Sequence, residues 1–330
     1  MKILMFSVRE DEKQFIQKWA QEHDAEVETN QEIVDAQTIE LAKGFDGISV
    51  QQHEAINDPA VYEKLAQMGI HHIALRMTGF NVVNLEAAKE NGIAITNVPA
   101  YSPRSVSEEA LAYTMGLLRK IKEAGLKMKE HDFSWPGLQT TEIHNMTVGI
   151  LGAGKIGGTS ARIFRALGAR VIANDLVQRP ELADTLEYVS FDELLKQSDV
   201  ITIHTILDDS THHLIDADAL HKMKNTALLI NCARGPIVEP NALVAALQNG
   251  EIAGAGLDTV EGEEGVVEND LRDSDRDLSL FDTLLAMPNV TMTPHIGFYT
   301  DAAVSSMVSM SLNDVDSLLH DKPSDHIVGG

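Results

Sequence analysis

Short apolar runs alternate with segments of helical periodicity along most of the chain. Residues 147–151 form one such run, and its β-branched and aliphatic side chains are typical of a buried parallel strand. Ile163, Phe164 and Leu167 follow at helical spacing, and residues 170–173 have the composition of the next strand. This alternation predicts an α/β fold with parallel sheets.

The same alternation continues on both sides of this segment. Further strands are predicted at residues 3–8, 47–50, 72–75, 93–97, 200–204, 227–231, 254–258 and 289–293. Further helices are predicted at residues 11–20, 60–68, 85–90, 103–121, 191–196, 217–223, 241–248 and 301–319. The first hundred residues thus form an α/β block of their own, and the last helix is expected to pack back on it.

The helix predicted at 103–121 has the clearest start signals. Ser102 can cap it, and Pro103 suits its first turn because the missing N–H of proline costs nothing there. Ser105 and Glu108 also fit a capping box. A long helix between the first block and the next strand is expected to be an interdomain element.

A glycine motif follows the strand at 147–151 directly. Residues 152–157 read Gly-Ala-Gly-Lys-Ile-Gly and match G-x-G-x-x-G, whose glycines make a tight turn, admit a pyrophosphate and let helix and strand pack closely. An acid at the end of the next strand has the spacing of the residue that binds ribose hydroxyls. The expected cofactor residues here are Gly152, Gly154, Lys155, Ile156, Gly157 and Asp175. The alternative is a glycine-rich turn in a Rossmann-like fold that binds another nucleotide.

Length, charge and cysteine content narrow the class of protein. A chain of 330 residues usually forms two domains, and a net charge of −24 opposes binding to nucleic acid or to an anionic membrane. Cys232 is the single cysteine, so no internal disulfide can form. No signal peptide or membrane-spanning run is apparent, and we therefore expect a soluble cytoplasmic protein.

The segment 261–277 is strongly acidic and has no period. Its aspartates from Asp273 to Asp277 alternate as in a calcium loop, but Leu278 and Leu284 occupy the positions of the required glycine and closing glutamate. We therefore expect a solvated loop, and we expect no metal site in this chain.

Ends of predicted strands carry the residues for a reaction centre. Arg234 is permanently charged and can hold a carboxylate through two parallel hydrogen bonds, although an arginine alone is as often a salt-bridge residue. His295 follows the last strand, and imidazole is the usual proton donor near neutral pH, with a structural role as the alternative. With a nicotinamide, these two side chains can reduce a 2-keto acid to a 2-hydroxy acid.

A carboxylate should hold the imidazole and favour its charged form. Glu261, Glu263 and Glu264 all follow the strand at 254–258 closely, and spacing alone does not choose among them.

The sequence resembles the D-isomer-specific 2-hydroxyacid dehydrogenases over nearly its whole length, and within them the bacterial D-lactate and D-2-hydroxyisocaproate dehydrogenases. The motifs that carry the resemblance are NVPAYSP at 97–103, GAGKIG at 152–157, NCARG at 231–235, GLDTVEGE at 256–263 and PHIGFYT at 294–300. Several separate motifs in the family's order make the match highly specific.

The resemblance implies two Rossmann-like domains, one flavodoxin-like and one NAD-binding, with parallel sheets and a cleft between them. The substrate domain would comprise residues 1–100 and 300–330, and the NAD-binding domain residues 101–299. The implied protein is an NAD-dependent homodimer that reduces pyruvate, and larger 2-keto acids, reversibly to the D-2-hydroxy acid. Alternatives are a dehydrogenase that prefers bulky 2-keto acids and an NAD(H)-sensing binding protein of the co-repressor type.

The resemblance also implies roles for single residues. Arg234 would bind the substrate carboxylate and carbonyl, His295 would be the acid/base, and Glu263 would be its partner. Substrate-binding residues would further be Thr78, Gly79, Tyr101, Phe298 and Tyr299, with Tyr101 reaching the carboxylate from the other domain. Cofactor-binding residues would further be Thr205, Ile206, Cys232, Ala233 and Asp258.

Some positions depart from the family's pattern. Met77 and Thr78 stand where the family has Asn-Val, so an asparagine side chain is missing. Thr205 and Ile206 replace Val-Pro on the adenine side. Gln51 aligns with a tyrosine of D-lactate enzymes and a leucine of hydroxyisocaproate enzymes, so the preferred size of substrate stays open.

Overall fold

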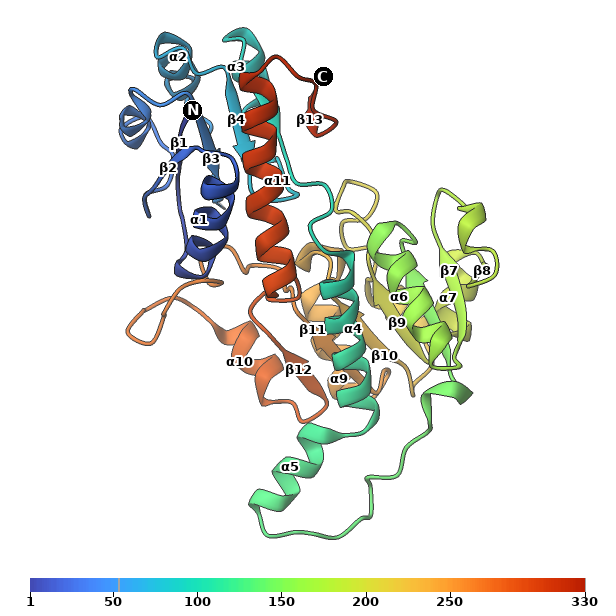
Figure 1. The fold of residues 1–330 in the computed structure, drawn as a ribbon. Helices are drawn as coiled ribbons and strands as arrows, with labels where there is room; N and C mark the ends of the chain where they lie inside the picture. The colour runs from blue at the N-terminus through green and yellow to red at the C-terminus, as the bar shows by residue number, and fades with distance from the viewer. Residues whose placement is uncertain (53, 330) are drawn as a thin grey trace. The chain divides into compact units, whose positions relative to one another are not determined.

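The computed structural model describes residues 1–52 and 54–329, and they form two compact units (Figure 1). Unit 1 comprises Met1–Ser102 and Tyr299–Gly330, and unit 2 comprises Pro103–Phe298. Each unit is built on its own largely parallel sheet, so the predicted α/β fold is confirmed. Among the described residues, no helix is both long enough and apolar enough to cross a membrane.

Unit 1 contains a six-stranded sheet of order β13-β5-β4-β3-β1-β2, in which only β13 is antiparallel to its neighbour. Its strands are β1 (Lys2–Met5), β2 (Glu26–Thr29), β3 (Gly47–Val50), β4 (His72–Leu75), β5 (Ala94–Thr96) and β13 (Ile327–Val328). Its α-helices are α1 (Lys13–Glu22), α2 (Pro59–Gln67), α3 (Leu85–Glu90) and α11 (Asp301–Leu319).

Helix α11 packs on the sheet of unit 1, as the sequence predicts. Val308 and Leu312 lie in one apolar cluster with Ile3 of β1 and Trp19 of α1. A Cβ atom at Gly47 would lie 2.6 Å from Val315, so glycine at this position of β3 lets the helix approach. The chain therefore returns to its first domain over the last 32 residues.

A buried ion pair fixes the carboxyl ends of strands in unit 1. Arg76 follows β4, and its Nε donates to Glu12 Oε1 at 3.0 Å with both side chains fully buried. The same guanidinium donates to the carbonyl of Phe6 at 2.8 Å and to Ser49 Oγ at 3.1 Å. Because β1, β3 and β4 all meet this arginine, the loop from Met77 onward starts from a fixed point.

Unit 2 contains a seven-stranded parallel sheet of order β12-β11-β10-β9-β6-β7-β8. Its strands are β6 (Thr147–Leu151), β7 (Arg170–Asn174), β8 (Glu187–Tyr188), β9 (Val200–Ile203), β10 (Leu228–Asn231), β11 (Gly254–Leu257) and β12 (Val290–Met292). Its α-helices are α4 (Pro103–Leu118), α5 (Ile121–Lys129), α6 (Lys155–Ala166), α7 (Phe191–Gln197), α8 (Ala217–Lys222), α9 (Pro240–Asn249) and α10 (Ser279–Ala286).

Apolar clusters on two sides of this sheet form the core of unit 2. Helices α4 and α6 contribute Tyr113 and Phe164 to one cluster, and α7 to α10 contribute side chains such as Leu194 and Leu284 to the other. Strand β6 lies between β9 and β7, so the chain reverses its direction of winding there. In such sheets ligands bind at the carboxyl ends of the strands beside this reversal.

A few local predictions are wrong. The first strand ends at Met5 and not at residue 8, and the helix predicted at 103–121 ends at Leu118. Ser105 lies inside α4, so it cannot cap that helix. Strands β2, β8 and β13 and helices α5 and α10 were not expected. Strand β2 is largely exposed at a sheet edge, and helix α5 buries no residue, so neither leaves an apolar signature in the sequence.

Candidate active site

The turn from β6 to α6 has the geometry of a pyrophosphate site. Gly152 adopts a φ of +88°, and a Cβ on it would lie 2.6 Å from the backbone nitrogen of Thr205. A Cβ at Gly157 would lie 1.9 Å from the carbonyl oxygen of Gly152. A Cβ at Gly154 would meet no described atom within 4 Å, so this side of the turn is open at the N-terminus of α6. A phosphate can therefore approach the backbone there.

Asp175 lies at the end of β7 beside the glycine turn. Its Oδ2 accepts a hydrogen bond from the backbone nitrogen of Ala153 at 2.7 Å, and its Oδ1 accepts one from Val177 at 2.7 Å. Arg179 Nη1 lies 3.2 Å from the same carboxylate. Backbone contacts thus orient the acid that the sequence assigns to the ribose. Ile206, assigned to the adenine side, is 73% exposed after β9.

His295 follows β12 in a left-handed conformation with a φ of +56°. Its backbone nitrogen donates to the carbonyl of Asp258 at 2.9 Å, which holds the residue in this turn. Its Nδ1 lies 2.9 Å from Glu263 Oε1, and the two side chains are 26% and 17% exposed. The carboxylate fixes the ring and leaves Nε2, on the other side of the ring, for proton exchange with a ligand.

The three neighbouring glutamates have different partners. Glu263 contacts His295 and also accepts from the backbone nitrogen of Val260 at 3.2 Å. Glu261 Oε2 lies 2.6 Å from Nε2 of a different histidine, His213. Glu264 is exposed, and its carbonyl accepts a hydrogen bond from Arg276. The tertiary structure therefore shows which of the three glutamates contacts His295, a choice that spacing in the sequence leaves open.

Asp258 supports the loop that carries His295 without touching the imidazole. It is almost fully buried after β11 and accepts hydrogen bonds from the backbone nitrogens of Ile296 and Gly297, each at 2.8 Å. The hydroxyl of Thr293 also donates to it. Thr293 is a member of the site that the sequence analysis missed, because a single threonine at a strand end gives no signal of its own.

Glu109 is a second residue that the sequence analysis missed. It lies on α4 and comes close to Gly297, because a Cβ built on Gly297 would lie 3.6 Å from Glu109 Cβ and 2.8 Å from Asp258 Oδ2. Burial, together with the charge of Asp258, raises the pKa of Glu109. The two acids therefore share one partly desolvated region beneath the histidine loop.

The loop after β10 carries Arg234 at its exposed edge. Its Nη1 donates to the carbonyl of Ala233 at 2.7 Å, and Asn231 Nδ2 donates to the carbonyl of Arg234 at 3.0 Å. Gly235 follows, and a Cβ on it would lie 2.2 Å from the carbonyl carbon of Val260. The arginine loop therefore lies directly against the loop that leads to the glutamates.

Cys232 directly follows β10 and is buried in the apolar cluster to which α4 and α6 contribute. Its pKa is raised well above the ordinary value, first by burial and then by the nearby charges of Asp258 and Glu109. The thiol is therefore held in its neutral form, which is a poor nucleophile.

Unit 1 holds most of the other residues assigned to the substrate. The hydroxyl of Thr78 donates to the carbonyl of Val98 at 2.8 Å, and Asn97 Nδ2 donates to the carbonyl of Thr78 at 2.6 Å, so the loops after β4 and β5 are joined. Tyr299 is exposed, and the guanidinium of Arg9 lies 5.6 Å from the centre of its ring. Gly79 and Tyr101 are half-buried in the same unit, while Phe298 packs against the core of unit 2.

Residues 111–297 match the family model described as "D-isomer specific 2-hydroxyacid dehydrogenase, NAD binding domain". The chain belongs to this family. It is 40% identical to a D-2-hydroxyacid dehydrogenase (NAD(+)) of Clostridioides difficile over 95% of both chains, and 38% identical to an aromatic 2-oxoacid reductase of Clostridium sporogenes over 94% of both. A solved D-lactate dehydrogenase from a Sporolactobacillus species is 51% identical over 99% of both chains, with a TM-score of 0.91.

The family's NAD-binding domain covers most of the chemical features of unit 2 described above. The matched residues include the glycine turn, Asp175, Arg234, Glu263 and His295. The open side of the turn at Gly154 and the close packing at Gly157 fit a dinucleotide. The chain is thus an NAD-dependent oxidoreductase of this family.

Proposed function

We propose that this protein is a D-lactate dehydrogenase, which reduces pyruvate to D-lactate with NADH and catalyses the reverse reaction. The observation that carries the proposal is the contact between His295 Nδ1 and Glu263 Oε1, in a unit whose glycine turn fits NAD. A histidine held by a carboxylate, in the same unit as a dinucleotide site, is what reduction of a carbonyl requires.

The proposed chemistry assigns one task to each side chain. The guanidinium of Arg234 binds the carboxylate of the 2-keto acid and polarises its carbonyl. The bound nicotinamide supplies the hydride. His295 donates a proton from Nε2 to the carbonyl oxygen, and in lactate oxidation it accepts that proton back. Glu263 stabilises the protonated ring, and Asp258 holds the loop in place.

The two units take separate roles in this proposal. Unit 2 binds NAD, and unit 1 supplies Thr78, Gly79, Tyr101 and Tyr299 to the substrate. We further propose a homodimer in the cytoplasm, as expected from the family resemblance and from a chain with a single cysteine. Light scattering of the purified protein measures the oligomeric state, and a mass of one chain at working concentrations contradicts the dimer.

Steady-state kinetics with NADH and a series of 2-keto acids test the assignment. We expect turnover of pyruvate, with tolerance of larger acids such as phenylpyruvate. A complete lack of pyruvate turnover contradicts the lactate assignment, and a strong preference for phenylpyruvate supports the alternative of a bulky-acid reductase. Gln51 supports that alternative, because it stands where the resemblance expects the bulkier tyrosine of D-lactate enzymes and so leaves room for a larger acid.

The cofactor preference follows from Asp175. Its carboxylate should bind both ribose hydroxyls and repel a 2′-phosphate, so kcat/KM for NADH should exceed that for NADPH. Arg179 lies 3.2 Å from the same carboxylate and neutralises part of its charge. Comparable kcat/KM values for the two cofactors contradict the assigned role of Asp175.

A further inference from the structure

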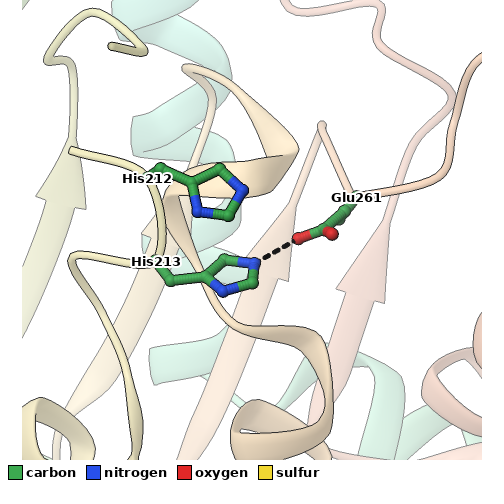
Figure 2. A group of neighbouring side chains, drawn as sticks. All are labelled: His212, His213 and Glu261. Atoms are coloured by element: carbon green, nitrogen blue, oxygen red, sulfur yellow. Dashed lines mark hydrogen bonds and ion pairs between the residues drawn. The ribbon is translucent and has the colours of Figure 1, made fainter. Parts of the chain in front are cut away.

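Two adjacent histidines and a distant glutamate meet in unit 2, apart from the pair of His295 and Glu263. His212 and His213 lie between β9 and α8, and Glu261 lies in the loop after β11 (Figure 2). Each residue offers one ligand atom, and these three atoms all lie within 4.8 Å of one another. The proposed reaction gives none of the three a task.

The backbone holds both histidines in place. The nitrogen of His213 donates to the carbonyl of Pro236 at 2.8 Å, and the nitrogen of His212 donates to the carbonyl of Asp208 at 2.9 Å. His213 adopts a φ of +51°, and the ring centroids of the two histidines are 4.0 Å apart with a tilt of 32°. The left-handed turn thus brings two consecutive side chains to the same side of the loop, as Figure 2 shows.

Glu261 is positioned independently of the histidines. A Cβ at Gly235 would lie 2.3 Å from the backbone nitrogen of Glu261, so the loops after β10 and β11 are in direct contact there. Its Oε2 lies 2.6 Å from His213 Nε2, and the two side chains are 35% and 31% exposed. His212 is more exposed, which leaves one side of the group open to solvent.

The donor set is selective for one class of cation. Two imidazole nitrogens and one carboxylate oxygen suit Zn²⁺ and neighbouring transition metals, whereas Mg²⁺ and Ca²⁺ prefer ligands that are all oxygen. Ligands at ~2.0–2.1 Å from a tetrahedral Zn²⁺ lie ~3.3 Å apart, so small side-chain rotations would close the group. A water molecule can take the fourth position from the open side.

The surrounding charge favours a cation. The whole chain carries a net charge of −24. Glu239 caps α9 nearby. Its backbone nitrogen donates to the carbonyl of Ile215 at 3.0 Å, so a second carboxylate lies beside the loop that carries the histidines.

We propose that His212, His213 and Glu261 form a binding site for one divalent transition metal ion, of which Zn²⁺ is the probe ion. The ion would replace the contact between His213 and Glu261 and would join the loops after β9 and β11. The sequence analysis predicted no metal site in this chain. The proposed metal site does not depend on the proposed substrate or reaction.

Titration of the metal-free protein with Zn²⁺ against a chromophoric chelator tests the site. We expect one equivalent to bind to the wild type, and His212→Gln, His213→Gln and Glu261→Gln each to weaken that binding at least tenfold. Substituting a residue that only hydrogen-bonds a metal ligand already weakens metal binding ~10–100-fold, so loss of a ligand itself should cost no less. The matched control is His221→Gln, which removes an exposed histidine 3.6 Å from Glu251 in the same unit and should leave binding unchanged.

One further variant and a check of folding keep the result decisive. His295→Asn removes another histidine that contacts a glutamate in unit 2, and it should retain the wild-type affinity for Zn²⁺. Thermal unfolding without metal checks that each variant folds, and added Zn²⁺ should raise the midpoint of the wild type but not of His212→Gln. The exposed position of His212 makes its variant the least disruptive to folding.

Three results would overturn the proposal. They are an absence of stoichiometric Zn²⁺ binding by the wild type, an unchanged affinity in the folded His212→Gln variant, and loss of the bound ion in His295→Asn alone. A catalytically inactive protein that still binds one Zn²⁺ through these three residues would support the site while contradicting the proposed function.

Discussion

Two histidines that follow strands of the same sheet are in opposite environments. His204 follows β9, and its Nε2 meets the hydroxyls of Ser160 and Thr202, each at 3.0 Å. Its Nδ1 is buried without a hydrogen-bond partner among the described residues, and burial lowers its pKa to about 4. His295 follows β12, remains partly exposed and faces the carboxylate of Glu263 at 2.9 Å.

The difference shows what makes a strand-end histidine suitable for acid/base chemistry. Removing an imidazole from water penalises its charged form, and hydroxyl partners do not offset that penalty as a carboxylate does. His204 is therefore neutral and structural, whereas His295 can carry a proton to a ligand. Position at the end of a strand is common to both and does not distinguish them.

The largest expected effect is on catalytic activity, which substitution of His295 should lower far more than substitution of His204. His295→Ala should lower kcat/KM for pyruvate reduction by ~10²–10⁴-fold, because a positioned acid/base usually contributes that much. His204→Asn should lower it less than tenfold in protein that is folded. Steady-state kinetics of both variants measure the contrast, and equal losses would contradict the difference in role between the two histidines.

The second effect concerns the carboxylate beside His295. Glu263→Gln keeps the shape of the side chain and removes the charge that stabilises the imidazolium, so pyruvate reduction should lose activity at lower pH. The alkaline limb of its pH profile should therefore move to lower pH. Lactate oxidation needs the neutral ring, so its acid limb should move down as well.

The control for this experiment is Glu261→Gln, measured in a metal chelator, because Glu261 contacts His213 and not His295. Profiles of kcat/KM against pH in both directions decide between the two glutamates. Limbs that move in Glu261→Gln but stay fixed in Glu263→Gln would show that the partner of His295 is assigned wrongly.

A third effect concerns stability in acid. His204 has a pKa of about 4 in the folded chain against an ordinary value of 6.5, so the unfolded chain binds more protons between these values. Stability should therefore fall as the pH drops from 6.5 towards 4, and His204→Gln should lose less stability over that window. Thermal midpoints between pH 7 and pH 4.5 measure this.

His72 limits how much of the acid sensitivity one substitution can remove. It is buried in unit 1 against Thr96, and burial lowers its pKa to about 3, so the same sign applies to it. A His204→Gln variant whose midpoint falls as steeply as that of the wild type would indicate that His72 and other groups carry the effect.

The smallest expected effect is at Cys232. Cys232→Ala removes a buried, neutral thiol and should keep most of the activity, within a few-fold of the wild type. Kinetics with pyruvate and NADH measure it. A loss of several thousandfold would mean that the thiol takes part in the chemistry, and the contrast between the two histidines would then describe only part of the site.

The sequence by itself determined the fold class and the positions of most strands in the two sheets. Strands at 47–50, 72–75 and 147–151 are found as predicted, because buried parallel strands need continuous apolar runs that stand out from their surroundings. Edge strands such as β2 and the exposed helix α5 bury too little to leave such a signal. The sequence also predicted the glycine turn, because only glycine fits at positions 152 and 157.

Spacing in the sequence did not decide which side chains meet: the family resemblance implied the pairing of Glu263 with His295, and only the tertiary structure revealed that of Glu261 with His213. Glu261 and Glu263 are two positions apart in one loop, yet one contacts His213 and the other His295. The partners lie 48 and 32 positions away along the chain, so no local pattern records the pairing. The strength of such contacts depends on distance and burial, and both are set by how the loops at the carboxyl edge of the sheet pack against one another.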